Sequence, residues 1–327
     1  MVVAARARGG GIVGGGRCLY CYGELKEGER NFHPGCARRM FGSPIVPQLP
    51  YVRKDVENLA KEVVRSSITV PGVQAKLSVE LSGSRKDPAR FTIVGLWGKY
   101  ILKPQTENYE HLPEIEDLTM HLAQIAGLST AYHSLFRFAD GELCYLTKRF
   151  DRLKNGKKVA VEDMCQLTGR LTELKYKGSY EQIAKTVMKY AASPLISVET
   201  FWEMVIFSWL TGNSDMHLKN FSLWDPFFSG DYMMAPAYDL LSTWMVMEDK
   251  EELALTLNAK KRKLGRQDFT VAMRRSGLND KVMDKLFILF LAVGRRWMDF
   301  IDKAFIPDSM KADYKRLIEE RLSRLEP

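Results

Sequence analysis

Apolar and polar positions change their spacing near residue 150. Before that point, short segments alternate between apolar and polar residues, which is typical of half-buried β-strands. After it, longer segments carry apolar residues at helical spacing. This order predicts an α+β protein in which a mostly β half precedes a helical half.

The individual elements follow from these spacings. The predicted strands cover an alternating segment that ends at residue 79 and residues 90–96, 99–103, 131–138 and 143–150. The predicted helices cover residues 54–66, 114–126, 178–193, 198–211, 267–276, 279–304 and 309–325. A short strand pair is expected among the later helices, near 231–235 and 252–257.

The most apolar helix leads directly into a polar cluster. Residues 201–211 are apolar almost all round, as expected of a buried helix, and Gly212 is a common helix-ending signal. Asp215 and Asn220 follow with the spacing Asp-x-x-x-x-Asn, and Asp239 comes after a further short stretch. A polar cluster at the end of a core helix is held rigidly, as a catalytic loop must be.

This spacing equals that of a protein-kinase catalytic loop. In such a loop one Asp orients the attacking hydroxyl and accepts its proton, while an Asn and a second Asp hold magnesium ions at the phosphates. The sequence therefore indicates Asp215 as a catalytic base, with Asn220 and Asp239 as Mg²⁺ ligands. Asn213 and Ser214 replace the usual His-Arg, which excludes an ordinary eukaryotic-type kinase. A plain polar loop after a buried helix is the alternative explanation.

A lysine closes one of the predicted strands. Lys103 ends the strand 99–103, where a kinase places the lysine that binds the α- and β-phosphates. The next helix begins with acidic residues, and Glu116, or else Glu114, is expected to pair with Lys103 as in kinases. The alternatives are a solvated lysine at a strand end and acidic residues favoured by the helix dipole.

A cysteine and histidine motif lies near the N-terminus. Cys18 and Cys21 form C-x2-C, and His33 and Cys36 form H-x2-C further along. Two such pairs can wrap a tetrahedral Zn²⁺, and a segment this short needs a metal to fold. We predict a structural zinc site; the alternatives are a metal-free loop and a redox Cys-x-x-Cys.

Composition narrows the class of protein. The chain has 327 residues, 46% of them apolar, which is enough for two or three domains with an ample core. The net charge of +8 favours an acidic partner, such as nucleotide phosphate, nucleic acid or an acidic protein face, without choosing among them. The chain has no apolar run long enough to span a membrane and no signal-peptide layout at its start, so a cytoplasmic protein is expected.

A hydroxyl-rich turn precedes the first predicted strand. It contains Ser67, Thr69 and the single glycine Gly72, ahead of alternating residues. Such a turn can bring backbone N–H groups to phosphate oxygens, but it matches no glycine-rich nucleotide motif. Taken alone, an ordinary approach to a hairpin explains it better.

Seven motifs, in this order, carry a family resemblance. They cover residues 70–76, 101–104, 148–152, 161–166, 212–220, 236–240 and 253–258. Together they resemble the HipA family of serine/threonine kinase toxins, over roughly residues 60–325. The resemblance implies a two-lobed protein-kinase-like (HipA-like) fold that uses ATP and Mg²⁺, with a small β-rich N-lobe and a helical C-lobe.

The resemblance also implies residue roles. Asp215 would be the catalytic base, Asn220 and Asp239 the Mg²⁺ ligands, and Lys103 the phosphate-binding lysine. Further residues expected at the nucleotide are Thr69, Gly72, Gln74, Lys76, Glu116, His217, Lys219 and the backbone of Lys148 and Phe150. Family members autophosphorylate a hydroxyl just before the glycine of this loop, which here is Thr69 or else Ser67, and the added charge could expel the loop.

Substrates and partners follow from the resemblance as well. The family's substrates are aminoacyl-tRNA synthetases, whose phosphorylation arrests growth. A cognate antitoxin, often a helix-turn-helix DNA-binding protein, neutralises the kinase, so contact with DNA would be indirect. Fewer residues precede the 70–76 loop than in longer toxins, so a separate protein would replace their N-terminal subdomain.

The resulting domain assignment has four parts. Residues 1–16 form a disordered Gly-rich leader, 17–45 the Cys/His zinc knuckle, 46–150 the kinase N-lobe and 151–327 the helical C-lobe. The expected function is an ATP- and Mg²⁺-dependent serine/threonine protein kinase, the toxin of a HipBA-like toxin–antitoxin system. The alternatives are a catalytically silent regulatory member of such a complex and a small-molecule phosphotransferase.

Overall fold

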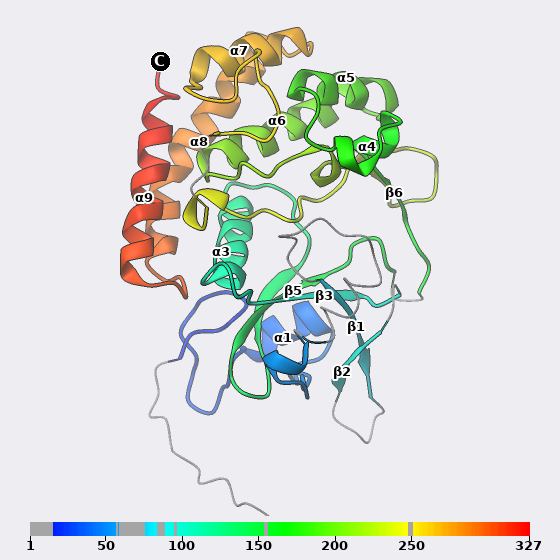
Figure 1. Cartoon of the computed structure of the whole chain (residues 1–327), viewed down its shortest axis with the longest axis vertical. Coiled ribbons are helices and arrows are strands. Elements are labelled where there is room, and N and C mark those ends of the chain that lie inside the picture. Colours follow the sequence, from blue (N-terminus) through cyan, green and yellow to red (C-terminus); the bar gives the residue numbers. More distant parts are fainter. Residues whose placement is uncertain are drawn as a thin grey trace, which may run out of the picture.

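The chain forms a β-rich small lobe and a helical large lobe, as the sequence predicted (Figure 1). The computed structural model describes residues 16–56, 58, 76–83, 89–94, 97–153, 156–247 and 251–327. Outside these residues lie nearly all of the predicted leader, most of the predicted helix 54–66, and the turn with Ser67, Thr69, Gly72 and Gln74.

The small lobe is built on one antiparallel sheet. Its strands are β1 (Leu77–Ser82), β2 (Arg90–Ile93), β3 (Tyr100–Pro104), β4 (His133–Arg137) and β5 (Leu143–Lys148), in the order β2-β1-β3-β5-β4. Helix α1 (Pro34–Phe41) packs on this sheet, where the Phe41 ring contacts Phe91 on β2 and Phe136 on β4 at centroid distances of 6.0 and 5.6 Å. The cysteine and histidine segment therefore shares the core of the small lobe.

Helix α3 (Leu112–Ile125) lies between the two lobes (Figure 1). It packs against β4 and β5 of the small lobe and against α8 of the large lobe. The indole N–H of Trp297, on α8, donates a hydrogen bond of 2.9 Å to the carbonyl of Leu122. The domain boundary at 150 stays a prediction, but α3 is fixed from both sides.

The large lobe consists of helices with a small sheet at their edge. The helices are α4 (Met164–Leu167), α5 (Tyr180–Tyr190), α6 (Pro194–Leu210), α7 (Arg266–Arg275), α8 (Asp280–Ile301) and α9 (Asp308–Ser323). The sheet has the order β6 (Ala160–Asp163), β7 (Ser222–Asp225) and β8 (Met233–Met234). Helix α6 begins earlier than predicted, because Pro194 suits the first turn of a helix.

One predicted strand pair is wrong. Strand β8 pairs with β7, in the register Leu223↔Met234, and not with residues 252–257. The segment 252–257 forms isolated bridges and no named strand: Thr256 pairs with Ser179, the residue before α5, and Leu257 pairs with Lys260. Its leucines at alternate positions are buried in the core, and this alternation imitates the pattern of a strand.

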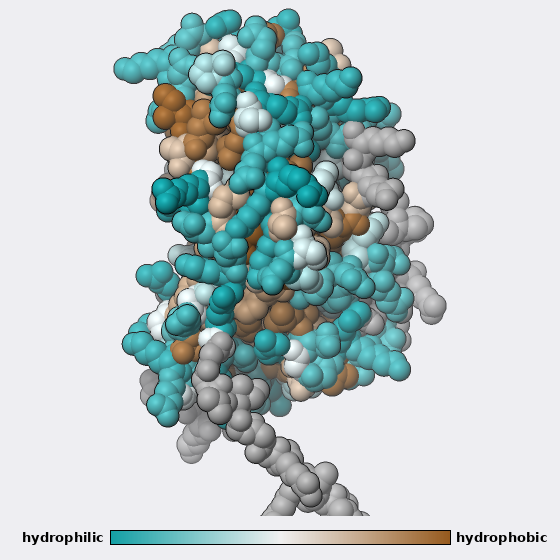
Figure 2. Space-filling view, turned by 90° about the vertical axis from the view of Figure 1, so that its left-hand side faces the viewer, coloured by the Kyte–Doolittle hydropathy of each residue, from teal (hydrophilic) through white to brown (hydrophobic). Residues whose placement is uncertain are grey.

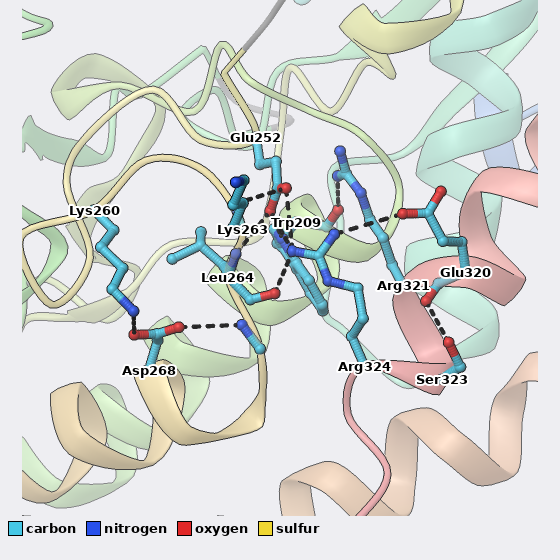
Figure 3. A network of polar contacts seen from close by, with 11 residues as sticks. Trp209, Glu252, Lys260, Lys263, Leu264, Asp268, Glu320, Arg321, Ser323 and Arg324 are labelled. Atoms are coloured by element: carbon cyan, nitrogen blue, oxygen red, sulfur yellow. Dashed lines mark hydrogen bonds and ion pairs between the residues drawn. The ribbon is translucent and has the colours of Figure 1, made fainter.

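A polar network anchors the end of α6 to α9 (Figure 3). The indole of Trp209 donates to Glu252 at 2.8 Å, and Arg324 donates to the same carboxylate at 2.9 Å. Burial opposes ionisation, but these two donors keep the pKa of Glu252 below its usual value. Arg321 donates to the Trp209 carbonyl. Because α6 ends just before Gly212, the network fixes the start of the polar loop.

The molecular surface carries separate apolar patches on a mainly hydrophilic background. Figure 2 shows this for the face turned toward the viewer. Among the residues described, no helix is both long enough and apolar enough to cross a membrane.

Candidate active site

The loop that follows α6 starts with a turn that only glycine fits. Gly212 has a φ of +74°, and a Cβ at this position would lie 2.7 Å from Leu317 and 2.8 Å from Trp244. The Gly212 carbonyl accepts hydrogen bonds from the Trp244 N–H at 3.0 Å and from the Thr243 hydroxyl at 3.1 Å. The start of the loop is therefore held by the turn that contains Thr243 and Trp244.

Replacing Gly212 by Ala is expected to lower the free energy of unfolding by about 1–3 kcal/mol, because strain and steric overlap add. Gly277→Ala is the matched control. Gly277 has a φ of +90°, but the nearest atom to its Cβ would be 4.0 Å away, so it tests backbone strain alone. Denaturant unfolding measures both variants, and an equal loss in the two would contradict the close fit of Gly212.

Asp215 projects its carboxylate toward a tyrosine hydroxyl. The Tyr176 hydroxyl donates a hydrogen bond to Asp215 Oδ1, and burial together with this carboxylate raises the pKa of Tyr176. Asn213 Oδ1 accepts a bond of 3.1 Å from the Asp215 N–H. The buried Asn220 donates from Nδ2 to the Asp215 carbonyl at 3.0 Å, which directs its amide oxygen away from the loop backbone.

Asp239 is held by two lysines. The buried amine of Lys103 contacts both Glu116 and Asp239, and Lys76 contacts the second oxygen of Asp239 at 2.8 Å. The structure thus contains the pairing of Lys103 with Glu116 that the sequence predicted. Asp239 has a φ of 59°, in the left-handed region that Asp tolerates better than most residues.

The charges of this group depend on one another. Burial opposes the charge of Lys103, but Asp239 and Glu116 keep its pKa above the usual value. Burial would also raise the pKa of Asp239, yet Lys103 and Lys76 hold it well below its usual range. Burial, with the charge of Asp239 nearby, raises the pKa of Glu116 to about 7 in spite of Lys103. A carboxylate at Asp239 is thus strongly favoured.

The segments that carry Asp239 and Asn220 are tied together. Tyr238, directly before Asp239, donates from its hydroxyl to the Lys219 carbonyl at 2.9 Å. The Ala237 carbonyl accepts a hydrogen bond of 2.9 Å from the N–H of Ala131, which lies shortly before β4. Asp239 and Asn220 therefore both lie on segments that neighbouring backbone holds in place.

The predicted adenine contacts lie where β5 ends. The N–H of Lys148 already donates to the Tyr132 carbonyl at 2.7 Å, so it is not available to a nucleotide. The Phe150 ring packs edge-on against Trp224 at 5.4 Å and tilted against Tyr238 at 5.6 Å. This places Phe150 next to the segment of Asp239.

The two other predicted nucleotide residues, His217 and Lys219, have protein partners. Lys219 pairs with Asp163 at 2.7 Å, and Asp163 also caps α4 through a reciprocal capping box with Gln166. His217 is buried, with its ring edge-on to Tyr176 at 4.9 Å, and burial lowers its pKa. In the structure both residues support the loop.

Sequence reasoning missed two residues at this site. Asp163 could have been found, because Asp followed three residues later by Gln is a capping-box signature. Tyr176 gave no signal, because it lies in a loop outside any periodic segment.

The four cysteine and histidine residues form a second, separate cluster. Their ligand atoms all lie within 4.8 Å of one another, and His33 Nδ1 is 3.4 Å from Cys21 Sγ and 3.7 Å from Cys36 Sγ. Tetrahedral zinc with bonds of about 2.3 Å to sulfur and about 2.0 Å to nitrogen would separate such ligands by about 3.5 Å. His33 Nε2 lies 2.9 Å from the Glu24 carbonyl, a partner that leaves Nδ1 facing the cluster. The set fits zinc.

Comparison with known proteins shows a match to one protein family. The family model described as HipA-like C-terminal domain matches residues 68–295. A Haemophilus influenzae protein named as a candidate kinase is 31% identical over 60% of this chain and 58% of its own length. The serine/threonine-protein kinase toxin HipA of Shewanella oneidensis is 28% identical over 58% of this chain and 47% of its own length. The chain spans about half the length of the curated relatives that it matches.

Solved structures give the same fold. HipA of Shewanella oneidensis, solved with HipB and operator DNA, has a TM-score of 0.67 at 20% identity, covering 93% of this chain and 75% of its own. The Helicobacter pylori proinflammatory kinase CtkA has a TM-score of 0.54 at 16% identity, covering 76% of this chain and 93% of its own. The family match spans both lobes, from before β1 into α8, and includes Lys103, Asp215 and Asp239, so the chain belongs to the family with the HipA-like C-terminal domain.

Proposed function

We propose that the chain is an ATP- and Mg²⁺-dependent serine/threonine protein kinase and the toxin of a HipBA-like toxin–antitoxin system. The observation that carries this proposal is the contact of the Lys103 amine with both Glu116 and Asp239. A protein kinase needs its lysine–glutamate pair and its metal-binding aspartate in place together. The name of the Shewanella oneidensis relative supports the serine/threonine specificity.

The residues fit a magnesium–nucleotide complex by their donor types. Asp239 and Asn220 offer oxygen atoms, the ligands that Mg²⁺ prefers, and the amines of Lys103 and Lys76 suit phosphate oxygens. Bound Mg²⁺ would neutralise charge on the phosphates. The Lys103 amine would then leave Asp239 and bind the phosphates, while its contact with Glu116 keeps it oriented.

Asp215 is the base in this proposal. It would accept the proton of a substrate hydroxyl as that oxygen attacks the γ-phosphorus and the bond to the β-phosphate oxygen breaks, releasing ADP. The Tyr176 hydroxyl makes the kind of hydrogen bond to Asp215 that such a substrate would make. This contact supports a hydroxyl group as the acceptor of the phosphoryl group. Tyr176 would have to move aside before a substrate hydroxyl could bind to Asp215.

Transfer of radiolabel from γ-labelled ATP tests the proposed reaction. The purified protein should label serine or threonine of acid-precipitated protein when Mg²⁺ is present, and Asp215→Ala should not. Label that remains entirely in acid-soluble small molecules would instead favour a small-molecule phosphotransferase. No transfer to either class, from protein that binds ATP, would favour a silent regulatory member.

An aminoacyl-tRNA synthetase or another translation protein is the substrate class that we infer, with growth arrest as the consequence. We also infer a cognate antitoxin, because the HipA structure described above contains HipB and operator DNA. Phosphoproteomics after induced expression, comparing the wild type with Asp215→Ala, would identify the substrate.

Autophosphorylation is expected at Thr69 or Ser67, which lie outside the described residues. Mass spectrometry after incubation with MgATP should find one added phosphate there, absent from Asp215→Ala. Unmodified peptides from an active preparation would contradict this form of self-regulation.

One equivalent of zinc per chain is expected in the purified protein. Cys21→Ser should lose it, because a hydroxyl replaces a zinc-binding thiolate, and Cys144→Ser is the matched control because Cys144 is buried in β5. Elemental analysis measures the content. A second equivalent that survives in Cys21→Ser would instead point to the buried cluster of Asp117, His121 and His133.

A further inference from the structure

Tyr22 is the point where the cysteine and histidine segment reaches helix α3. It directly follows Cys21, adopts a φ of 61°, and donates its N–H to the Cys18 carbonyl at 2.9 Å. Its side chain is 1% exposed. The turn that carries two zinc ligands therefore also fixes this tyrosine.

The Tyr22 ring is enclosed by the large-lobe side of the molecule. It stacks on Phe300 of α8 at 5.0 Å and meets Phe305 and His121 edge-on at 4.7 and 4.9 Å. Tyr22 belongs to the larger core cluster, whereas Cys18 and its neighbours belong to the small-lobe cluster. The Cys18–Tyr22 turn thus spans both cores.

The Tyr22 hydroxyl binds a buried carboxylate on α3. It donates to Asp117 Oδ2 at 2.8 Å, and His133 Nδ1 on β4 lies 2.7 Å from the other oxygen. Although burial opposes ionisation, His121 and His133 hold the pKa of Asp117 below its usual value. A tyrosine donor to a buried carboxylate is a strong hydrogen bond that is costly to lose.

Asp117 is next to Glu116, the partner of Lys103. Adjacent side chains on a helix diverge by about 100°, so α3 directs Asp117 toward Tyr22 and Glu116 toward Lys103. A displacement of this turn of α3 therefore moves both contacts together. In kinases, the position of this glutamate controls activity.

We propose that the metal-loaded Cys/His segment positions helix α3 through the Tyr22–Asp117 hydrogen bond, so that zinc at Cys18, Cys21, His33 and Cys36 sets the geometry of the Lys103–Glu116 pair. Tyr22 is then a positioning residue. The expected effect on phosphoryl transfer rests on the proposed kinase function. The expected effect on the position of α3 does not.

Hydrogen exchange of α3 and phosphoryl transfer, measured with and without zinc, test this coupling. Removing zinc from the wild type with a chelator should speed amide exchange in residues 112–125 and lower kcat/KM about tenfold or more. Tyr22→Phe should produce the same two changes while it keeps one zinc, because the ring still packs. Removing zinc from Tyr22→Phe should then add little, since both changes break one linkage.

Tyr20→Phe is the matched control, because Tyr20 lies in the same turn but packs on the small-lobe cluster, and it should resemble the wild type. Asp117→Asn weakens the hydrogen bond between Tyr22 and Asp117 by changing its acceptor. It replaces Tyr22→Phe in the experiment if that variant does not fold. Unchanged exchange in α3 after zinc removal, or additive effects of the two changes, would overturn the proposal. An inactive wild type would defeat the kinase function alone, and the exchange data would still decide the coupling.

Discussion

Replacing Asp215 by Asn is expected to reduce phosphoryl transfer by about 10²–10⁴-fold while the fold is retained. The amide cannot accept the proton of the attacking hydroxyl, but it can still accept the hydrogen bond of Tyr176. The loop would therefore keep its shape. Steady-state kinetics with MgATP and an unchanged denaturation midpoint would together show a chemical defect.

The control for this variant is Asp231→Asn. Asp231 is an exposed residue on the segment before β8, so its replacement changes net charge equally without reaching the site. It should retain the wild-type rate. Nearly full activity in Asp215→Asn would contradict the proposed role of Asp215 as the base, and so would growth arrest by Asp215→Ala at wild-type strength.

Replacing Lys103 by Met is expected to lower activity at least about a hundredfold and stability by about 3–5 kcal/mol. The methionine fills similar space, but it leaves the buried Glu116 beside Asp239 without the cation between them. Removing one partner of a buried ion pair exposes the remaining charge to the full desolvation penalty. Denaturant unfolding and kinetics measure the two effects.

The stability loss in Lys103→Met should grow as the pH rises above about 7, where the folded wild type ionises Glu116 but the folded variant still holds it protonated. The pKa of Glu116 is about 7 in the wild type, and loss of Lys103 raises it further. A carboxyl group whose pKa is raised by folding favours the folded state at low pH, and that stability is lost as the pH rises through the folded pKa. Asp239, with its depressed pKa, contributes a constant amount across this range.

Lys99→Met is the matched control for Lys103→Met. Lys99 directly precedes β3 and pairs with Glu80 at 3.1 Å, with its side chain 34% exposed. A partly exposed pair contributes at most about 1 kcal/mol. If Lys99→Met and Lys103→Met lost the same stability, the buried network around Asp239 would have no special importance.

The elements with strong periodicity were predictable from the sequence. Helices α3, α5 to α9 and the five strands of the small lobe lie near their predicted ranges, because the burial of one face imposes a repeating pattern. Strands β6 and β7 were not predicted as strands, because segments of four residues carry too little periodicity. Residues 252–257 showed the reverse error, since leucines occupy alternate positions there although the segment forms no strand.

The candidate site was predictable where the chemistry fixes both residue type and order. Lys103, Glu116 and Asp239 are such a set, and the structure brings them into contact. The hydrogen bond of Tyr22 to Asp117 joins residues 95 positions apart, and that of Tyr176 to Asp215 starts from an irregular loop. No local pattern encodes such contacts, because they depend on tertiary packing between segments that are distant in the sequence.

If Asp239 binds Mg²⁺ as proposed, the two lysines on its carboxylate determine the order in which metal and nucleotide can bind. A divalent cation that arrives alone must compete with an amine at either oxygen of Asp239 and lies close to two positive charges. A cation that arrives on a polyphosphate brings the negative charge that draws both amines away. Free metal should therefore bind weakly, and metal and nucleotide should enter this protein as a single complex.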